Sequence, residues 1–286
     1  MSIQSGSGPL RRVYVRPPAA TPATGWRAAG WHEAPDPGRA ADEHAALRSM
    51  LEVAGAEVVI GRPAGPEHPD AIYAYDPVLL ASAGAIVVRP GKPGRRGEPA
   101  EVAADLSAVG IGTIGRVVAP GIAEGGDMFW LDDTTLLIGL GYRTNRDGGR
   151  QIDALLPGVE VLTFDLPHHL GPDRCLHLMS GVSPLAEDLA IVFQPILPAR
   201  LLQLLAERGV RWVEVPPEEF DSMGPNVLAL APRVALALDG NPETRRRMEA
   251  MGVEVKTYEG REISRKGDGG PTCLTRPLER DLGRRA

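Results

Sequence analysis

One pattern constrains the fold of this chain more than any other feature, because it occurs five times along the sequence. Each occurrence has a stretch of apolar residues at helical spacing, then a glycine, then a short run rich in β-branched residues. Glycine most readily takes the left-handed conformation at which helices end, so each unit is predicted to be a helix followed by a strand. The five glycines are Gly55, Gly110, Gly158, Gly209 and Gly252.

Each interval between these glycines also holds a second strand candidate. The intervals are 55, 48, 51 and 43 residues long, and they contain the segments GAIVVRP, TTLLIGLG, DLAIVFQP and RVALALDG. Five such units are most economically closed into a ring, since an open array leaves an unpaired edge strand at each end. We therefore predict an α/β propeller with pseudo-fivefold symmetry, a single domain over residues 1–286. Strands at residues 12–16 and 273–278 should meet and close the ring.

An ordinary doubly wound α/β sheet is the alternative fold, because helices and strands alternate there too. Its usual nucleotide-binding signatures, G-x-G-x-x-G after a strand and the Walker sequence, are absent from this sequence. Two stretches rich in proline and glycine, residues 17–38 and 61–69, are predicted to be long surface loops. Loops of that length are often lids or binding segments.

The charge balance bears on the kind of ligand. The sequence has 31 basic and 37 acidic side chains and a net charge of −6, the wrong sign for a surface that binds nucleic acid or an anionic membrane. No apolar run approaches the ~20 residues of a membrane span, and the first residues lack the apolar core of a signal peptide. Two cysteines, Cys175 and Cys273, are too few for a disulfide scaffold. We expect a cytoplasmic protein with a small-molecule ligand, and the sequence leaves a homodimer open as its assembly.

Three segments carry candidates for a nucleophile and its base. Cys273 follows the glycine-rich turn GDGGPT, where a thiol can be exposed, although a buried structural cysteine is the more common case. His177 lies in CLHLMSG, and in a strand it would face away from its apolar neighbours and toward a pocket. Glu124 precedes a glycine pair in EGGD, where a carboxylate could orient a histidine. Taken alone, a core histidine and a solvated acidic turn are the structural alternatives for the last two.

Two further pairs of residues could hold a charged substrate. Asp70 and Asp76 lie six residues apart in DAIYAYD, a spacing that puts both carboxylates on one face of a strand, although an aspartate before a proline also opens turns. Arg95 in GKPGRRGE and Arg143 in GYRTN could each bind a substrate carboxylate through the planar guanidinium fork. Most arginines, however, are simply surface residues.

Taken together, these segments resemble a known family. EGGD, GLGYRTN, HLMSG and GDGGPTC, preceded by HPDAIYAYDP and RPGKPGRRGE, are similar to segments of the guanidine-modifying enzymes of the pentein fold. Their order and spacing look most like dimethylarginine dimethylaminohydrolases, with arginine deiminases next. The similarity runs from about Arg12 to Cys273, and it implies a five-bladed α/β propeller.

The resemblance implies a catalytic role for three residues. Cys273 matches the nucleophile, His177 the general acid and base, and Glu124 the carboxylate that holds this histidine. The implied reaction is attack of the thiolate on a guanidinium carbon, loss of an amine, and hydrolysis of an S-alkylthiouronium intermediate to a urea such as citrulline. This chemistry requires neither a cofactor nor a metal.

The resemblance also implies substrate-binding roles. Asp70 and Asp76 match positions that bind the guanidinium, and Arg95 and Arg143 match positions that clamp the α-carboxylate of an amino-acid substrate.

Two positions depart from the family patterns. Tyr75 stands where dimethylarginine dimethylaminohydrolases often carry a glutamate, and Met179 stands where arginine deiminases usually carry an aspartate. Met179 therefore counts against a plain deiminase and leaves room for a less polar N-substituent on the substrate. An arginine deiminase-like hydrolase and an amidinotransferase, which passes the amidino group to an amine, stay open as alternatives.

Two interpretations from other classes are also open. Cys175, His177 and Cys273 with one carboxylate would make four zinc ligands, although Cys-x-His is not a standard zinc-finger spacing. The chain could also be a non-catalytic binding protein on the same ring. Preferential reaction of Cys273 with a chloroacetamidine-type reagent would distinguish an enzyme from a zinc protein and from a non-catalytic binding protein.

Overall fold

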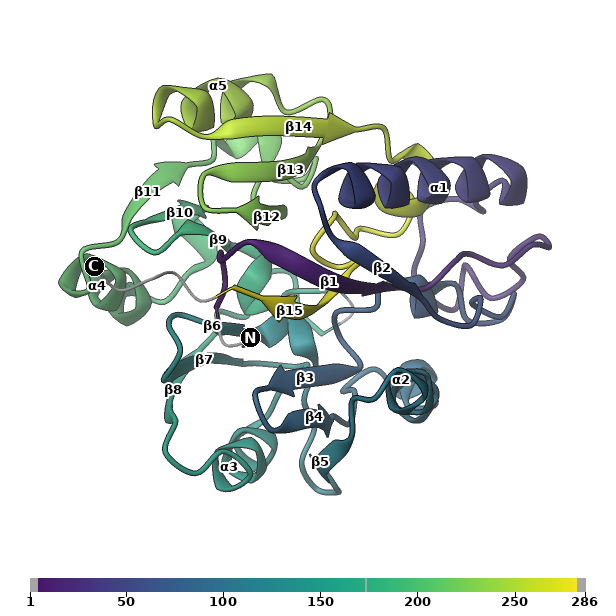
Figure 1. The fold of residues 1–286 in the computed structure, drawn as a ribbon, viewed down its shortest axis with the longest axis horizontal. Helices are drawn as coiled ribbons and strands as arrows, with labels where there is room; N and C mark the ends of the chain where they lie inside the picture. The colour runs from purple at the N-terminus through teal and green to yellow at the C-terminus, as the bar shows by residue number, and fades with distance from the viewer. Residues whose placement is uncertain (1–4, 173, 282–286) are drawn as a thin grey trace.

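The strands of the computed structural model, which describes residues 5–172 and 174–281, form five small sheets around a common centre (Figure 1). Each sheet has three strands, in the orders β15–β1–β2, β3–β4–β5, β6–β7–β8, β11–β10–β9 and β12–β13–β14. The strands are β1 (Leu10–Val15), β2 (Glu57–Ile60), β3 (Val78–Ala81), β4 (Gly84–Val87), β5 (Thr113–Arg116), β6 (Met128–Trp130), β7 (Thr135–Leu140), β8 (Glu160–Asp165), β9 (Val182–Ala186), β10 (Leu189–Val192), β11 (Arg211–Glu214), β12 (Val227–Ala231), β13 (Val234–Leu238), β14 (Glu254–Tyr258) and β15 (Arg276–Arg280).

One helix accompanies each sheet on the outside of the ring (Figure 1). The helices are α1 (Pro37–Val53), α2 (Glu98–Ala108), α3 (Arg146–Ala154), α4 (Ala199–Glu207) and α5 (Pro242–Ala250). In every unit an antiparallel strand pair is followed by the helix and then by a strand parallel to the middle one, as in β3, β4, α2 and β5. This arrangement confirms the predicted propeller and excludes the doubly wound sheet.

Four of the predicted glycines directly follow the C-cap residue of a helix, and the fifth, Gly158, lies in the turn four residues after the end of α3. Their φ angles are 92°, 86°, 85°, 73° and 79° at Gly55, Gly110, Gly158, Gly209 and Gly252. A Cβ atom added at any of the five would meet no atom within 4 Å. The requirement for glycine is therefore the left-handed backbone conformation, not a lack of space.

The first and last strands close the ring as predicted. β1 pairs with β15 antiparallel, with Val13 opposite Pro277 and Tyr14 opposite Arg276, and it pairs with β2 parallel. The last strand begins at Arg276 and not at Cys273, so the cysteine lies in the turn that leads into the strand. In the part of the chain that is described, none of the helices combines the length and apolar character needed to cross a membrane.

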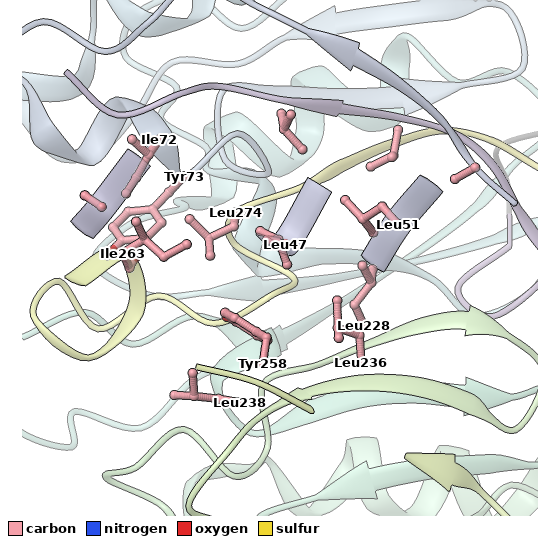
Figure 2. Close-up of a cluster of buried hydrophobic side chains, with 14 of the residues drawn as sticks. Leu47, Leu51, Ile72, Tyr73, Leu228, Leu236, Leu238, Tyr258, Ile263 and Leu274 are labelled. Carbon is pink, nitrogen blue, oxygen red and sulfur yellow. Dashed lines mark hydrogen bonds between the residues drawn. The ribbon is translucent and has the colours of Figure 1, made fainter. Parts of the chain in front are cut away.

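The segment around Cys273 is anchored by a buried hydrophobic cluster (Figure 2). Leu47 and Leu51 reach this cluster from α1, Leu236 reaches it from β13, and Leu274 joins it directly after the cysteine. Leu47, Leu51, Leu236 and Leu274 are fully buried, and each such side chain contributes roughly 1.5–3 kcal/mol to the free energy of folding. The packing of Leu274 therefore holds the neighbouring thiol in place.

Candidate active site

The residues singled out in the sequence surround one cavity of about 460 Å³. Segments from different blades contribute to it, so residues more than 200 positions apart in the chain share one wall. Glu124 lies directly behind this wall and is fully buried. The predicted residues that line the cavity are Asp70, Asp76, Arg95, Arg143, His177 and Cys273.

His177 faces this cavity, but not from a strand. It caps a short 3₁₀ helix, Leu178–Ser180, and β9 begins only at Val182. Its backbone N–H donates to Ser180 Oγ at 3.0 Å, and the N–H of Leu178 donates to Asp127 Oδ1 at 3.0 Å. The predicted strand at this position was wrong, because these side-chain oxygens hold the backbone in a turn.

Glu124 holds the imidazole of His177. Glu124 Oε2 lies 2.8 Å from His177 Nε2, and it also accepts from Arg143 Nη1 at 2.8 Å. Burial by itself would raise the pKa of Glu124, but His177 and Arg143 outweigh burial and lower it, so the carboxylate stays charged. With Nε2 engaged, Nδ1 is the ring nitrogen left for chemistry, and it lies 3.6 Å from Cys175 Sγ and 4.0 Å from Asp76 Oδ1.

The charge state of His177 follows from its surroundings. Burial alone would lower the pKa of the imidazole, but its interactions with Cys175, Asp76 and Asp127 raise it well above its ordinary value. These surroundings therefore favour the protonated form of His177.

The glycine pair before β6, Gly125 and Gly126, leaves room for the ring of His177 and for the turn at Tyr75. A Cβ atom on Gly126 would lie 2.4 Å from His177 Nδ1, and one on Gly125 would lie 2.1 Å from the carbonyl oxygen of Tyr75. Real Cβ atoms essentially never show such distances, so Gly126 permits the close approach of the His177 ring and Gly125 that of the turn at Tyr75.

Cys273 is placed by hydrogen bonds from two other segments. Asn226 Nδ2 donates to its Sγ at 3.1 Å, and the N–H of Tyr75 donates to its carbonyl oxygen at 3.1 Å. Burial raises the pKa of the thiol to about 11, although the Asn226 hydrogen bond and His177 lower it in part. The free protein therefore carries a neutral thiol, and a cation entering the cavity would favour the reactive thiolate.

Asp70 and Asp76 both line the cavity, although the predicted strand through them was also wrong. Asp70 lies in a 3₁₀ helix, Pro69–Ile72, and Asp76 follows in a turn. Asp76 accepts from Arg95 and, at 2.9 Å, from the N–H of Gly126. The turn structure therefore brings the two carboxylates to one cavity without the even spacing of a strand.

The carboxylate of Asp70 is tied to the loop before α1. It accepts from Trp31 Nε1 at 2.8 Å and from Lys92 Nζ, and the same lysine nitrogen donates to the carbonyl oxygen of Ala29. Ala29 also lines the cavity. Part of the long loop predicted at residues 17–38 is therefore fastened beside the site.

Arg95 and Arg143 are engaged with acidic groups of the site. Arg95 donates to Glu98 at 3.0 and 2.7 Å and to Asp76, and Arg143 donates to Glu124. The carboxylate-clamp role of the two arginines stays a prediction. In this structure Arg95 holds Asp76 in position, and Arg143 does the same for Glu124.

Sequence comparison places this site in a known family. A dimethylarginine dimethylaminohydrolase of Pseudomonas aeruginosa is 30% identical over 246 residues, which cover 84% of this chain and 89% of that protein. The chain belongs to the pentein superfamily. Within the superfamily it is most like the dimethylarginine dimethylaminohydrolases, and a model of the arginine deiminase family also matches residues 183–280.

Solved structures agree with this assignment to the penteins. A mutant of the Pseudomonas aeruginosa dimethylarginine dimethylaminohydrolase in complex with citrulline has 25% sequence identity and a TM-score of 0.76, covering 93% of this chain and 98% of that one. The N-terminal domain of ArgZ, a cyanobacterial arginine dihydrolase bound to its product, has a TM-score of 0.81 over 94% of this chain and 97% of that chain. At 18% identity it supports the pentein fold alone.

Three side chains of this pentein cavity were missed in the sequence. Asn226 and Lys92 lie in turns, and nothing in their local sequence shows that they reach Cys273 or Asp70. Arg174 lines the cavity, is exposed, and has no ion pair with any described residue. In the sequence, only its position three residues before His177 indicated that Arg174 could lie near the site.

The zinc ligands considered from the sequence, Cys175, His177 and Cys273 with one carboxylate, do not form a metal-binding group among the described residues. Asp76, Glu124 and His177 have donor atoms within 4.8 Å of one another, the one such group in the described chain. Both carboxylates already face an arginine, Arg95 and Arg143 respectively. A divalent cation would have to sit beside two guanidinium groups, which electrostatic repulsion opposes.

Asp127 gives the pentein site a testable pH dependence. Burial raises the pKa of this carboxyl to about 7 from an ordinary value of 3.8, and its Oδ2 has no partner among the described residues. A raised carboxyl pKa stabilises the fold below about pH 4, and this contribution is lost as the pH rises through about 7. We expect Asp127→Asn, which does not titrate there, to show a smaller fall in melting temperature between about pH 5 and about pH 8 than the wild type.

The matched control is Asp153→Asn, a change at an exposed aspartate on α3. It should leave the fall in melting temperature as it is in the wild type. An equal fall in all three proteins would show that Asp127 does not titrate in this range.

Proposed function

We propose that the protein is a cysteine-dependent hydrolase that converts dimethylarginine or methylarginine to citrulline and an amine. One observation carries the proposal: Cys273, Asp76 and the Nδ1 side of His177 meet at a single cavity. The similarity to dimethylarginine dimethylaminohydrolases, one of them in complex with citrulline, supports the same reaction.

The first step needs a cation to activate the thiol. A substrate guanidinium beside Asp76 would add positive charge near Cys273, whose thiol pKa in the free protein is about 11, and so favour loss of the thiol proton to solvent. The thiolate sulfur then bonds to the central guanidinium carbon and forms a tetrahedral intermediate. Asp76, held by Arg95, would keep the charge of the substrate in place.

The second step releases the amine. The carbon–nitrogen bond of the methylated nitrogen breaks as His177 donates its proton to that nitrogen, which leaves an S-alkylthiouronium on Cys273. The neutral imidazole then takes a proton from water, the hydroxide adds to the same carbon, and the carbon–sulfur bond breaks to give the ureido product and the free thiol. Glu124 keeps the ring oriented through both steps.

Met179 favours a substrate with an apolar N-substituent. It lines the cavity and offers a thioether where an acidic side chain would bind a second guanidinium N–H. Methyl groups on one guanidinium nitrogen suit such a wall. An arginine deiminase-like reaction on unmethylated arginine is the second candidate, which the match to the arginine deiminase model supports.

A substrate α-carboxylate has three arginines within reach of the cavity. Arg95 and Arg143 match the clamp positions, but both already contact carboxylates of the protein. Arg174 has no such partner among the described residues, so we add it to the candidates for this contact.

A colorimetric screen for ureido products tests the function. Arginine, methylated arginines, hydroxyarginine, agmatine and other guanidino acids are incubated with the protein, with Cys273→Ser as the blank. We expect methylated arginines to have the highest kcat/KM, at least ~10-fold above arginine, because a contact between apolar groups is worth on the order of 1–3 kcal/mol. Arginine as the best substrate would favour the deiminase-like reaction. Agmatine as the best substrate would show that Arg95 and Arg143 do not act by binding an α-carboxylate.

We also propose a cytoplasmic location and activity without a cofactor. Cys175 and Cys273 are both free thiols, and the proposed nucleophile has to stay reduced. A reducing compartment maintains that state.

A further inference from the structure

Two buried arginines without an ion pair to a described acid mark a second site in this protein. Four arginines are buried in the described chain, with 1%, 5%, 3% and 2% of their surface exposed at Arg16, Arg95, Arg276 and Arg280. Arg16 pairs with Glu101 at 2.7 Å, and Arg95 pairs with Glu98 and Asp76. Arg276 and Arg280 have no carboxylate within 4.0 Å among the described residues.

The acidic residues nearest to them in the chain point elsewhere. Glu279 lies 3.9 Å from Arg12, and Asp281 lies 2.6 Å from Arg11. Both of these pairs are on the surface of the ring. The strand β15 therefore turns its two acidic neighbours outward and its two arginines inward.

The contacts of the two arginines are to neutral groups. Arg276 Nη1 donates to the carbonyl oxygen of Tyr75 at 3.1 Å, and its guanidinium lies 4.2 Å from the centre of the Tyr75 ring. Arg280 Nη1 donates to the carbonyl oxygen of Gly8 at 2.6 Å. Arg276 Nε is buried and has no partner in the described part of the chain. Arg276 therefore has an unused hydrogen-bond donor, and the positive charges of Arg276 and Arg280 are not balanced by a described carboxylate.

Both arginines line one small cavity of about 30 Å³. Their spacing of four residues on β15 puts them on the same face of the strand. No carboxylate is among the described residues that line this cavity. Tyr75, Met179 and Thr272 line both this cavity and the active-site cavity, so the two cavities are adjacent.

The lack of a described carboxylate beside Arg276 and Arg280 lowers the stability of the folded protein. Burial lowers the pKa of Arg276, and it lowers the pKa of Arg280 to about 10, where the like charge of Arg276 adds to the effect. A buried charge without a partner destabilises a fold far more than a paired one. A group of opposite charge between the two arginines would remove most of this penalty.

We propose that the cavity lined by Arg276 and Arg280 binds one small monovalent inorganic anion of the size of chloride. Its volume of about 30 Å³, against about 460 Å³ for the active-site cavity, suits a small ion better than an amino acid or a sugar acid. The two guanidinium groups supply the charge, and Arg276 Nε supplies a free donor. This site is separate from the proposed hydrolase activity and does not depend on it.

The site has a physical connection to the nucleophile. Arg276 holds the carbonyl oxygen and the ring of Tyr75, and the N–H of Tyr75 donates to the carbonyl oxygen of Cys273. An anion that fixes Arg276 therefore also fixes the turn that carries the thiol.

Bromide, which scatters anomalously, locates the site directly. Crystals of the full chain are grown without halide, soaked in sodium bromide and measured at the bromine absorption edge. We expect an anomalous peak between Arg276 and Arg280. Bromide bound only on the surface, with no peak in this cavity, is binding of an adventitious ion only and would overturn the proposal.

Melting temperature tests the same site in solution. At equal ionic strength, sodium chloride should raise the melting temperature of the wild type by roughly 3–5 °C over sodium gluconate, whose anion is too large to enter. Arg276→Met should lose this difference, and Arg276→Lys, which keeps the charge, should retain part of it. Arg16→Met, at an arginine paired with Glu101, should melt lower in both salts and keep the full difference.

Equal melting temperatures of the wild type in the two salts would overturn the proposal, as would an undiminished difference in Arg276→Met. If Arg276→Met does not fold, Arg280→Met and the bromide map decide in its place. Neither measurement uses catalysis, so failure of this site and failure of the proposed function are distinguishable.

Discussion

Replacing Cys273 with serine is expected to reduce turnover of the guanidino substrate by at least roughly 10⁴-fold. A serine hydroxyl ionises at a far higher pH than a thiol and is the weaker nucleophile toward a resonance-stabilised guanidinium carbon. Serine is close to cysteine in size and can accept the Asn226 hydrogen bond that the sulfur accepts now. The variant should therefore fold, and an unchanged melting temperature beside the absent ureido product would show that chemistry alone was lost.

Cys175→Ser is the matched control for this variant. Cys175 is exposed at the rim of the same cavity, and serine can keep a contact to His177 Nδ1, which now lies 3.6 Å from the sulfur. Because Cys175 is one cause of the raised pKa of His177, we expect some loss of kcat/KM, roughly 10-fold at most and far less than in Cys273→Ser. Equal losses in the two variants, or full activity of Cys273→Ser, would remove Cys273 from the reaction.

Selective labelling gives the same prediction a second readout. A thiol with a pKa of about 11 has roughly one molecule in 10⁴ ionised at pH 7, so neutral chloroacetamide should label Cys273 slowly. Chloroacetamidine carries the positive charge that the thiolate needs and should label the same residue faster, by roughly 10²-fold. Peptide mapping should find the amidine on Cys273 and not on Cys175.

The fold was predictable because its repeating unit has a local signal. Gly55 and the four equivalent glycines need a left-handed conformation that few other residues adopt, and this need is visible in the sequence at regular intervals. Ring closure followed from the same repetition, and the pairing of β1 with β15 confirms it. The hydrophobic runs of the inner strands are likewise local features.

The sequence predicted which residues line the site, but not the backbone structure that places them. Cys273, His177 and Asp76 do meet at one cavity, but the strands expected around His177 and Asp76 are turns. Alternation over five to seven residues arises easily by chance, and bonds from distant side chains such as Asp127 to Leu178 decide the local backbone. Contacts of this kind have no signature in the local sequence.

Partners from other blades explain what the sequence missed. Asn226 reaches Cys273 from a segment 47 residues away, and Arg276 contacts Tyr75 across 201 residues. The sequence showed arginines near Cys273, but not that Arg276 and Arg280 are buried without acids. Burial and pairing depend on the closed ring, which no single segment contains.

Replacing His177 with alanine is expected to slow turnover of methylarginine by roughly 10³-fold and to separate the two halves of the reaction. An amine is a poor leaving group unless it is protonated, and His177 Nδ1 is the proposed source of that proton. S-methyl-L-thiocitrulline avoids this need, because methanethiolate can leave without a proton. His177→Ala should therefore release one methanethiol per protein molecule and then stop.

The covalent product would identify the step that stops. Cys273 bonds to the amidine carbon as the bond to the methylthio group breaks, so mass spectrometry should find the S-alkylthiouronium on Cys273. Formation should be slower than in the wild type at neutral pH and recover toward higher pH, since the charge of His177 lowers the pKa of Cys273. Cys273→Ser releases no methanethiol, which separates attack from hydrolysis. Continuous methanethiol release by His177→Ala would show that another group activates the water, and methylarginine turnover within about tenfold of the wild type would remove the histidine from both steps.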